Sequence, residues 1–171
     1  MQQGTAATFD EDTCTSIVKE EGAGELEAKW FGRRGEQGLV LSLVETAYLL
    51  LSEKIQVSST RGAASDLNQL VSLHQECFAE FFWPMLTVYK DLRDRGRRVK
   101  PVGRNSFLVR DKQGGMKLVY VLEEKHLEKT SELMSYVEAA RSNSLETVFA
   151  VVSLQGDLTY YEVSRINPVV E

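Results

Sequence analysis

The chain has 171 residues, enough to bury a hydrophobic core as one medium domain or two small ones, and we expect two. Its formal net charge of −5 excludes a protein that coats nucleic acid by charge alone, but leaves room for a local basic patch or a basic partner. No apolar run approaches the roughly 18 residues of a membrane span. Residues 1–21 are polar and acidic rather than signal-like, so we expect a cytoplasmic protein without membrane contact.

The first quarter of the chain carries few structural signals. Residues 1–25 mix Gly, Thr, Asp and Glu without a period, and we expect this segment to be partly disordered.

Cys14 and Cys77 have neither the spacing of a metal site nor that of a redox motif, so the sequence suggests neither zinc nor a redox role. Cys77 falls on an apolar helix face, where plain packing is expected.

Periodicity predicts the next elements. Residues 26–31 are expected to form a short strand, and residues 32–38 a turn or loop. Ser42 and Glu45 have the spacing of a capping box, which predicts a helix over 42–53 and a short strand at 55–58.

Apolar residues with helical spacing run from Ser65 to Phe81 and predict a long amphipathic helix. His74 lies on its apolar side, and we interpret it as a hydrogen-bonded core or boundary residue. No nucleophile or carboxylate constellation accompanies it.

The second half reads as one helix followed by a sheet. Pro84 suits a first helical turn, and Gly96 sits where a left-handed cap would end that helix. The expected order after it is strand 107–110, turn 111–115, strand 117–122, helix 131–141, strand 147–154, turn 155–157 and strand 158–166.

Two stretches carry a resemblance. The run TVYKDLRDRGRRVK at 87–100, followed by SFLV at 106–109, and the tail AVVSLQGDLTYYEVSR at 150–165 resemble the carboxyl-terminal domain of archaeal tRNA-splicing (tRNA-intron) endonucleases. The capped helix and strand beyond Ser42 resemble the amino-terminal domain of the same family. The resemblance implies an α/β (α+β) fold with a small N-terminal α+β domain, 1–82. A C-terminal mixed-sheet domain of the tRNA-intron or restriction-endonuclease-like type, 83–171, would follow.

The same resemblance locates three vacancies. In that family a tyrosine acts as base on the 2′-hydroxyl, a histidine as acid on the leaving oxygen, and a lysine stabilises the phosphorane. The tyrosine position here is Arg110, the turn 111–116 holds no histidine, and the segment 142–147 holds no lysine. The sequence therefore predicts no catalytic residues, no metal and no cofactor in this chain.

A chain of this kind resembles the structural subunits of the family, which have lost the triad and pair with catalytic subunits. The resemblance implies a heterotetramer with two of each subunit, which removes introns from precursor tRNA at bulge-helix-bulge sites. Its acidic turn would dock Asp157 into a basic cleft, and the last strand would be an apolar-rich contact or an ordinary internal strand. The expected partner-interface residues are Gly156, Asp157, Tyr160, Tyr161 and Val163.

Basic residues near the central helix offer contacts to tRNA phosphates, although a solvated helix end is the simpler interpretation. Arg165 resembles a family arginine that helps to hold a flipped base, but its usual companion falls near Glu138, so that clamp is incomplete. The candidate RNA contacts are Arg97, Arg98, Lys100, Arg104 and Arg165.

Two alternatives stay open. Asp111, Glu123 and Lys125 have the acid-x-Lys form of metal-dependent nucleases, in which two carboxylates hold Mg²⁺ and the lysine assists water. The other alternative is a stand-alone RNA-binding or assembly module without a nuclease partner.

Overall fold

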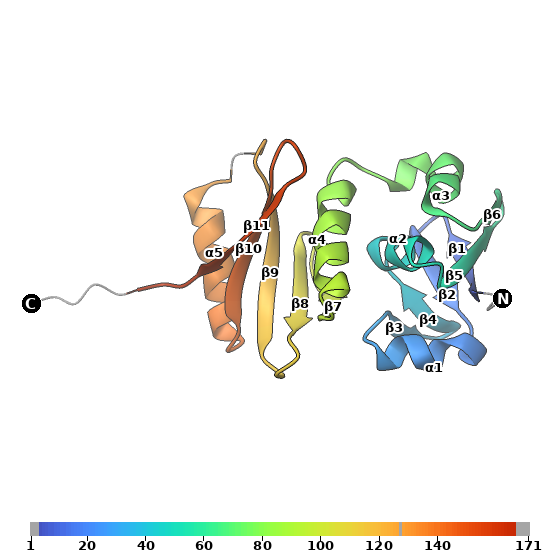
Figure 1. The fold of residues 1–171 in the computed structure, drawn as a ribbon, viewed down its shortest axis with the longest axis horizontal. Helices are drawn as coiled ribbons and strands as arrows, with labels where there is room; N and C mark the ends of the chain where they lie inside the picture. Colours follow the sequence, from blue (N-terminus) through green and yellow to red (C-terminus); the bar gives the residue numbers. More distant parts are fainter. Residues whose placement is uncertain (1–3, 127, 167–171) are drawn as a thin grey trace, which may run out of the picture. The chain divides into compact units, whose positions relative to one another are not determined.

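The computed structural model describes residues 4–126 and 128–166 (Figure 1). Its chain divides into two compact units, Met1–Lys90 and Asp91–Glu171. Each unit contains one mixed sheet with helices, so the expected α+β fold class is confirmed. The division falls inside helix α4 (Phe82–Asp94), whereas the sequence suggested a boundary at the start of this helix.

The N-terminal unit is built on a sheet with strand order β3-β4-β2-β1-β5-β6. Strands β1 and β5 are parallel, and the other neighbours pair in antiparallel fashion. The strands are β1 (Thr5–Asp10), β2 (Thr15–Val18), β3 (Arg33–Gly35), β4 (Gly38–Leu41), β5 (Ile55–Ser59) and β6 (Gly62–Ala64). The helices are α1 (Glu20–Ala28), α2 (Leu43–Leu51), α3 (Leu67–Leu73) and the 3₁₀ turn η1 (Gln75–Cys77).

The expected disorder of residues 1–25 is wrong for every residue of that segment that the structure describes. Strand β1 lies in the interior of the sheet between β2 and β5, and it buries Ala7 and Phe9. Ala6, Thr8 and Asp10 alternate with these two and are less buried, so the strand contains only a short apolar pattern that the composition did not reveal. The strand expected at 26–31 is also wrong, because Leu26 belongs to α1 and is buried with Ala23. Part of the loop expected at 32–38 forms the short strand β3.

The capping box predicted for α2 is confirmed. The Ser42 hydroxyl accepts a 3.3 Å hydrogen bond from the Glu45 amide, and the Ser42 amide donates to Glu45 Oε1 at 3.0 Å. Glu45 is 4% exposed, and its second oxygen accepts from the Gly32 amide at 2.5 Å. The glutamate therefore ties the start of α2 to the loop before β3.

The long helix expected over 65–81 is interrupted. Asp66 caps α3 by accepting a 2.9 Å hydrogen bond from the Gln69 amide, and this helix ends at Leu73. His74 leaves the helical region with φ −136° and ψ 49°, and η1 follows before α4 begins. The helical spacing of apolar residues in the sequence thus continues past a point at which the helix itself is interrupted.

The C-terminal unit is built on a sheet with strand order β11-β10-β9-β8-β7. Strands β9 and β10 are parallel and joined through α5, and the other neighbours are antiparallel, so the predicted mixed sheet is confirmed. Strand β7 was not predicted. The elements are β7 (Arg98–Pro101), β8 (Ser106–Arg110), β9 (Met116–Glu123), α5 (Thr130–Ser142), β10 (Glu146–Val152) and β11 (Leu158–Val163).

One face of this sheet packs against α5. Tyr120 and Phe149 from the sheet form a buried cluster with Ala140, and Leu133 and Val137 pack against it. Gly96 ends α4 with φ +80°, as predicted, a conformation that side chains other than glycine disfavour.

Among the described residues, the helices are all too short or too polar to cross a membrane.

Candidate functional site

The three positions at which the resemblance would place the catalytic residues lie at the same end of strands β8, β9 and β10. Arg110, at the end of β8, pairs with Met116, and Lys117 at the start of β9 pairs with Glu146 at the start of β10. The antiparallel partner β11 places Glu162 near the same end of β10. We call Arg110, the turn 111–116, Lys117, Glu146 and Glu162 the vacant edge.

Lys117 occupies the middle of the vacant edge between two carboxylates. Its Nζ lies 2.9 Å from Glu162 Oε1 and 3.6 Å from Glu146 Oε2. The hydrogen bond with Glu162 raises the pKa of Lys117, and the same bond lowers the pKa of Glu162. Lys117 therefore keeps its proton, and the carboxylates of Glu146 and Glu162 balance its positive charge.

A tyrosine also borders this edge, but in a form unsuited to proton abstraction. The Tyr160 hydroxyl donates a 2.6 Å hydrogen bond to Asp91 Oδ2, and Arg95 Nε lies 2.9 Å from the same oxygen. Burial, together with the hydrogen bond to Asp91, strongly raises the pKa of Tyr160. A phenol that stays protonated in this way is a poor general base.

A cavity of about 190 Å³ opens beside Tyr160 and Lys117. Arg95, Arg97 and Asp111 contribute polar groups to its wall. Neither histidine of the chain belongs to this wall, because His74 lies in the N-terminal unit and His126 follows β9 at the other end of that strand. The described residues of the vacant edge therefore include charged groups but no histidine.

The predicted docking turn projects from the opposite end of β10 and β11. Asp157 and Leu154 are exposed, Leu154 by 67%. The backbone is held by the Ser153 amide, which donates to the Asp157 carbonyl at 2.8 Å, and by the Asp157 amide, which donates to Ser153 Oγ at 2.9 Å. Gly156 supplies the positive φ of +86°. The Asp157 carboxylate is thus presented on a well-braced turn.

Strand β11 is the outermost strand of the described sheet and pairs with β10. Its side chains alternate: Tyr161 is 54% exposed, whereas Tyr160 turns toward Asp91. Val163 packs against the α5 cluster. In the described sheet β11 is therefore an edge strand and not an internal one, and its contact with a partner stays a prediction.

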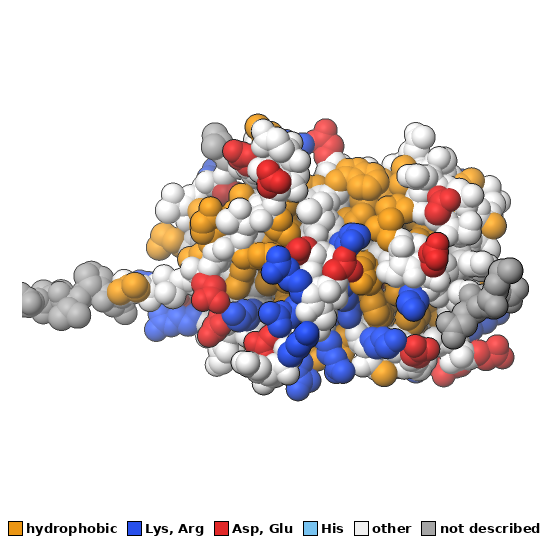
Figure 2. Space-filling view, viewed as in Figure 1, with side chains coloured by type: hydrophobic (Ala, Val, Ile, Leu, Met, Phe, Trp, Pro, Cys, Tyr) orange, Lys and Arg blue, Asp and Glu red, His pale blue; other side chains and the backbone are white. Residues whose placement is uncertain are grey.

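The candidate RNA contacts do not form one cluster. Arg97 and Arg98 lie where β7 begins, and Arg104 lies in the connection between β7 and β8, beyond the other end of β7. Arg165 follows β11, where its guanidinium is 3.7 Å from Glu138. Lysine and arginine side chains do gather around the end of the sheet where β8 runs into β9 (Figure 2).

The alternative metal site is wrong in its geometry. Asp111 caps the β8–β9 turn by accepting from the Gln113 and Gly115 amides at 2.9 and 2.7 Å. Glu123 lies at the far end of β9, 8 residues long, with His126 Nε2 at 2.9 Å. At about 3.3 Å per residue, the two carboxylates are separated by roughly 25 Å. They cannot share one ion, and the described residues contain no group of three metal-ligating side chains.

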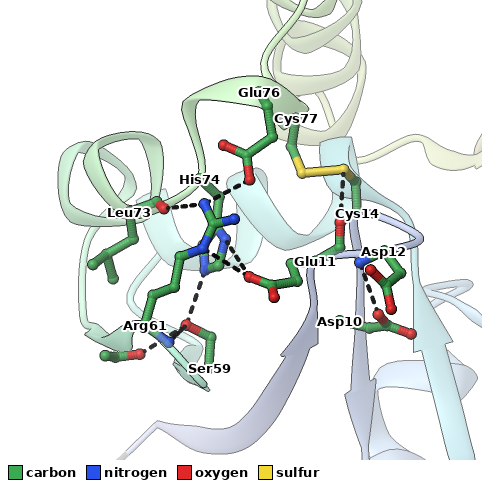
Figure 3. Close-up of polar contacts among 11 residues, drawn as sticks. Asp10, Glu11, Asp12, Cys14, Ser59, Arg61, Leu73, His74, Glu76 and Cys77 are labelled. Atoms are coloured by element: carbon green, nitrogen blue, oxygen red, sulfur yellow. Dashed lines mark hydrogen bonds and ion pairs between the residues drawn. A yellow bond between two sulfur atoms is a disulfide. The ribbon is translucent and has the colours of Figure 1, made fainter.

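A second polar cluster, in the N-terminal unit, surrounds His74 (Figure 3). His74 is fully buried, with Nε2 at 2.9 Å from Ser59 Oγ and its ring 4.5 Å from that of Phe9. The core interpretation of this histidine is therefore confirmed. Its Nδ1 has no hydrogen-bond partner and lies 3.9 Å from Glu11 Oε2.

Arg61 and a disulfide complete this cluster. Figure 3 shows Arg61 reaching from the β5–β6 turn toward Glu11, at 2.8 Å, and Glu76, at 2.6 Å. Cys77 follows Glu76 and is bonded to Cys14, with Cα atoms 5.7 Å apart. The expectation of plain packing for Cys77 is wrong. The spacing of the two cysteines gave no signal, because the pairing depends on bringing η1 against the β1–β2 turn.

Comparison with known proteins identifies the family. The profile described as tRNA intron endonuclease, N-terminal domain, matches residues 6–71, and the profile of the catalytic C-terminal domain matches residues 82–160. A protein from Thermococcus kodakarensis named tRNA-splicing endonuclease is 32% identical over 149 residues, which cover 84% of this chain and 88% of the relative. The chain belongs to the tRNA intron endonuclease family. The resemblance found in the sequence is thereby confirmed.

Relatives of two lengths exist within the tRNA intron endonuclease family. The Methanosarcina acetivorans tRNA-splicing endonuclease is 34% identical over 162 residues, covering 89% of this chain but 45% of the relative. The Methanococcoides burtonii tRNA-splicing endonuclease is 32% identical over 144 residues, covering 80% of this chain and 40% of the relative. The chain thus spans less than half the length of these two relatives.

Proposed function

We propose that this chain is a structural, non-catalytic subunit of a cytoplasmic, heteromeric tRNA-splicing endonuclease that removes introns from precursor tRNA at bulge-helix-bulge sites. Membership of the family and the shared name of the relatives support the process. The partner is a catalytic subunit of the same family, in a heterotetramer with two of each.

The vacant edge is the observation that carries this proposal. Cleavage through a 2′-hydroxyl needs a base for that hydroxyl and an acid for the leaving oxygen. Arg110 stands at the tyrosine position, Tyr160 is hydrogen-bonded to Asp91, and Lys117 is neutralised by Glu146 and Glu162. Arg110, which stays protonated, and Tyr160, whose pKa is raised, are therefore poorly suited to act as that base.

The exposed turn around Asp157 supports a mode of assembly. A carboxylate on a braced turn can enter a basic cleft without a large loss of conformational entropy. Strand β11 is the last strand of the described sheet, so the main-chain groups along its outer edge can pair with a partner strand. The exposed Tyr161 side chain on this strand offers a further contact.

The test is cleavage of precursor tRNA in EDTA by this chain, by a triad-bearing paralogue from the same organism, and by their mixture. We expect co-purification of the two chains and cleavage by the mixture alone. Cleavage by this chain alone would contradict the proposal. A stable monomer that leaves the paralogue unaffected would favour the stand-alone module instead.

The docking step is tested with D157A, and E36A in the β3–β4 turn is the matched control, since both remove one exposed turn carboxylate. We expect D157A to weaken assembly at least tenfold and leave the thermal midpoint unchanged. Equal effects of the two variants would rule out docking by Asp157.

A further inference from the structure

The Cys14–Cys77 disulfide fastens η1 to the β1–β2 turn directly beside a buried polar cluster (Figure 3). Both cysteines are partly exposed, so the bond lies near the surface of the N-terminal unit. Cys14 has φ +53°, a left-handed conformation that residues with a side chain disfavour. The disulfide therefore holds the turn in a backbone conformation that the turn can leave once the bond is broken.

The polar cluster contains two buried atoms that lack a hydrogen bond. They are His74 Nδ1 and Glu11 Oε2, 3.9 Å apart, and neither has a hydrogen-bond partner in the part of the chain that the structure describes. Arg61 Nε lies 2.8 Å from the same Glu11 oxygen and balances its charge. A buried polar atom without a hydrogen bond destabilises the state that buries it, whereas water satisfies the atom once it is exposed. The cluster thus favours opening when the tie that closes it is released.

The other ties that hold η1 are exposed to solvent. Arg61 donates a 2.9 Å hydrogen bond to the Leu73 carbonyl, and its guanidinium lies 2.6 Å from Glu76. The side chains of Arg61 and Glu76 are 44% and 52% exposed, so this ion pair contributes little to stability. Since η1 is only three residues long, its own backbone hydrogen bonds are few and local. The disulfide is therefore the main tie between η1 and the β1–β2 turn.

We propose that Cys14 and Cys77 form a redox switch that controls access to His74. A thiolate of a dithiol reductant attacks one sulfur, the S–S bond breaks and a mixed disulfide forms, and the second thiol of the reductant resolves it. Cys14 and Cys77 together gain two electrons and two protons, and the reductant becomes a disulfide. η1 then leaves the β1–β2 turn, and solvent reaches His74 Nδ1 and the Glu11 carboxylate. The switch does not depend on the proposed function, because all of its residues lie in the N-terminal unit.

Histidine reactivity tests the switch, because the chain has two histidines that differ in exposure. His74 is fully buried, whereas the His126 side chain is 54% exposed and serves as an internal control. The full chain is kept oxidised, or is reduced with dithiothreitol and freed of reductant without air. It is then treated with diethyl pyrocarbonate, and labelling is followed by peptide mass spectrometry. We expect reduction to speed the labelling of His74 at least about tenfold and to change that of His126 less than about twofold.

Three comparisons assign the effect to the disulfide. C14S/C77S should label His74 at the fast rate with or without reductant. Re-oxidation of the reduced unmodified chain should restore slow labelling, as a switch requires. E76Q is the matched control on η1, because it removes an exposed ion pair and keeps the disulfide, and its oxidised form should label His74 slowly.

Hydrogen exchange separates a local opening from loss of the fold. Reduction should speed exchange of the Cys77 and Phe78 amides, which bond to His74 and Gln75, while α2 and β5 stay protected. Fast exchange throughout the N-terminal unit would show unfolding in place of a switch and would overturn the proposal. Slow labelling of His74 in the reduced chain would overturn it directly. Equal labelling of oxidised E76Q and the reduced unmodified chain would assign the closure to the ion pair and overturn it as well.

Discussion

The Tyr160 hydroxyl donates its hydrogen bond to the carboxylate of Asp91, 69 positions earlier in the chain, over 2.6 Å. Asp91 lies near the end of α4 and Tyr160 in the edge strand β11, so this bond links the first and last elements of the C-terminal unit. Arg95 pairs with the same carboxylate and lies over the Tyr160 ring, 5.8 Å from its centroid. Tyr160 is therefore a bracing residue of its own unit.

Replacing Tyr160 with phenylalanine removes the hydrogen bond and keeps the ring. Because the acceptor is a charged group, we expect Y160F to lower the free energy of unfolding by about 1–3 kcal/mol. Urea unfolding at neutral pH measures it. Y161F, on the exposed side of the same strand, is the control and should change the free energy by less than about 0.5 kcal/mol. Equal effects of the two variants would show that the bond to Asp91 contributes nothing.

The same bond predicts a dependence on alkaline pH. In the unfolded chain a tyrosine loses its proton near pH 10, whereas burial and Asp91 raise the pKa of folded Tyr160 above that value. The folded state then holds a proton that the unfolded state has lost. Its stabilising contribution is complete below pH 10 and falls above it, by up to about 1.4 kcal/mol per pH unit. Unfolding between pH 9 and 11 should show this decline in the unmodified chain and a weaker one in Y160F.

The Cys14–Cys77 disulfide predicts a dependence on reductant. It closes a loop of 63 positions, for which the chain-entropy estimate is about 4 kcal/mol. A reducing agent should therefore lower the thermal midpoint of the unmodified chain toward that of C14S/C77S, and it should leave the double variant unchanged. If the unmodified chain kept its midpoint while a thiol assay showed both cysteines reduced, the disulfide would not be a source of stability.

The contrast between predicted and missed features follows the range of the interactions. The Ser42 and Glu45 capping box and the Gly96 cap were predictable because their partners lie within a few residues. Strand β1 pairs locally with β2, but its interior position in the sheet depends on a parallel pairing with β5, far along the chain, that the sequence did not indicate. The disulfide between Cys14 and Cys77 was missed for the same reason.

In the candidate site, too, the features that depend on nearby residues were predictable from the sequence, and those that depend on distant residues were not. The vacancy at Arg110 was visible in the sequence, because the family pattern is local. That Lys117 is held between Glu146 and Glu162 follows only from the register of three strands.

Glu45 provides a last prediction, because it combines a local and a distant role. Its buried carboxylate accepts from Ser42 within the capping box and from Gly32 outside the helix. E45A would leave both amides without this acceptor, and we expect a loss of about 2–4 kcal/mol in the free energy of unfolding. E45Q keeps one acceptor oxygen and should lose less. E25A in α1, whose carboxylate is exposed and pairs with Lys29, is the control and should stay within about 0.5 kcal/mol of the unmodified chain. A similar loss in E45A and E25A would show that the buried contacts of Glu45 do not stabilise the N-terminal unit.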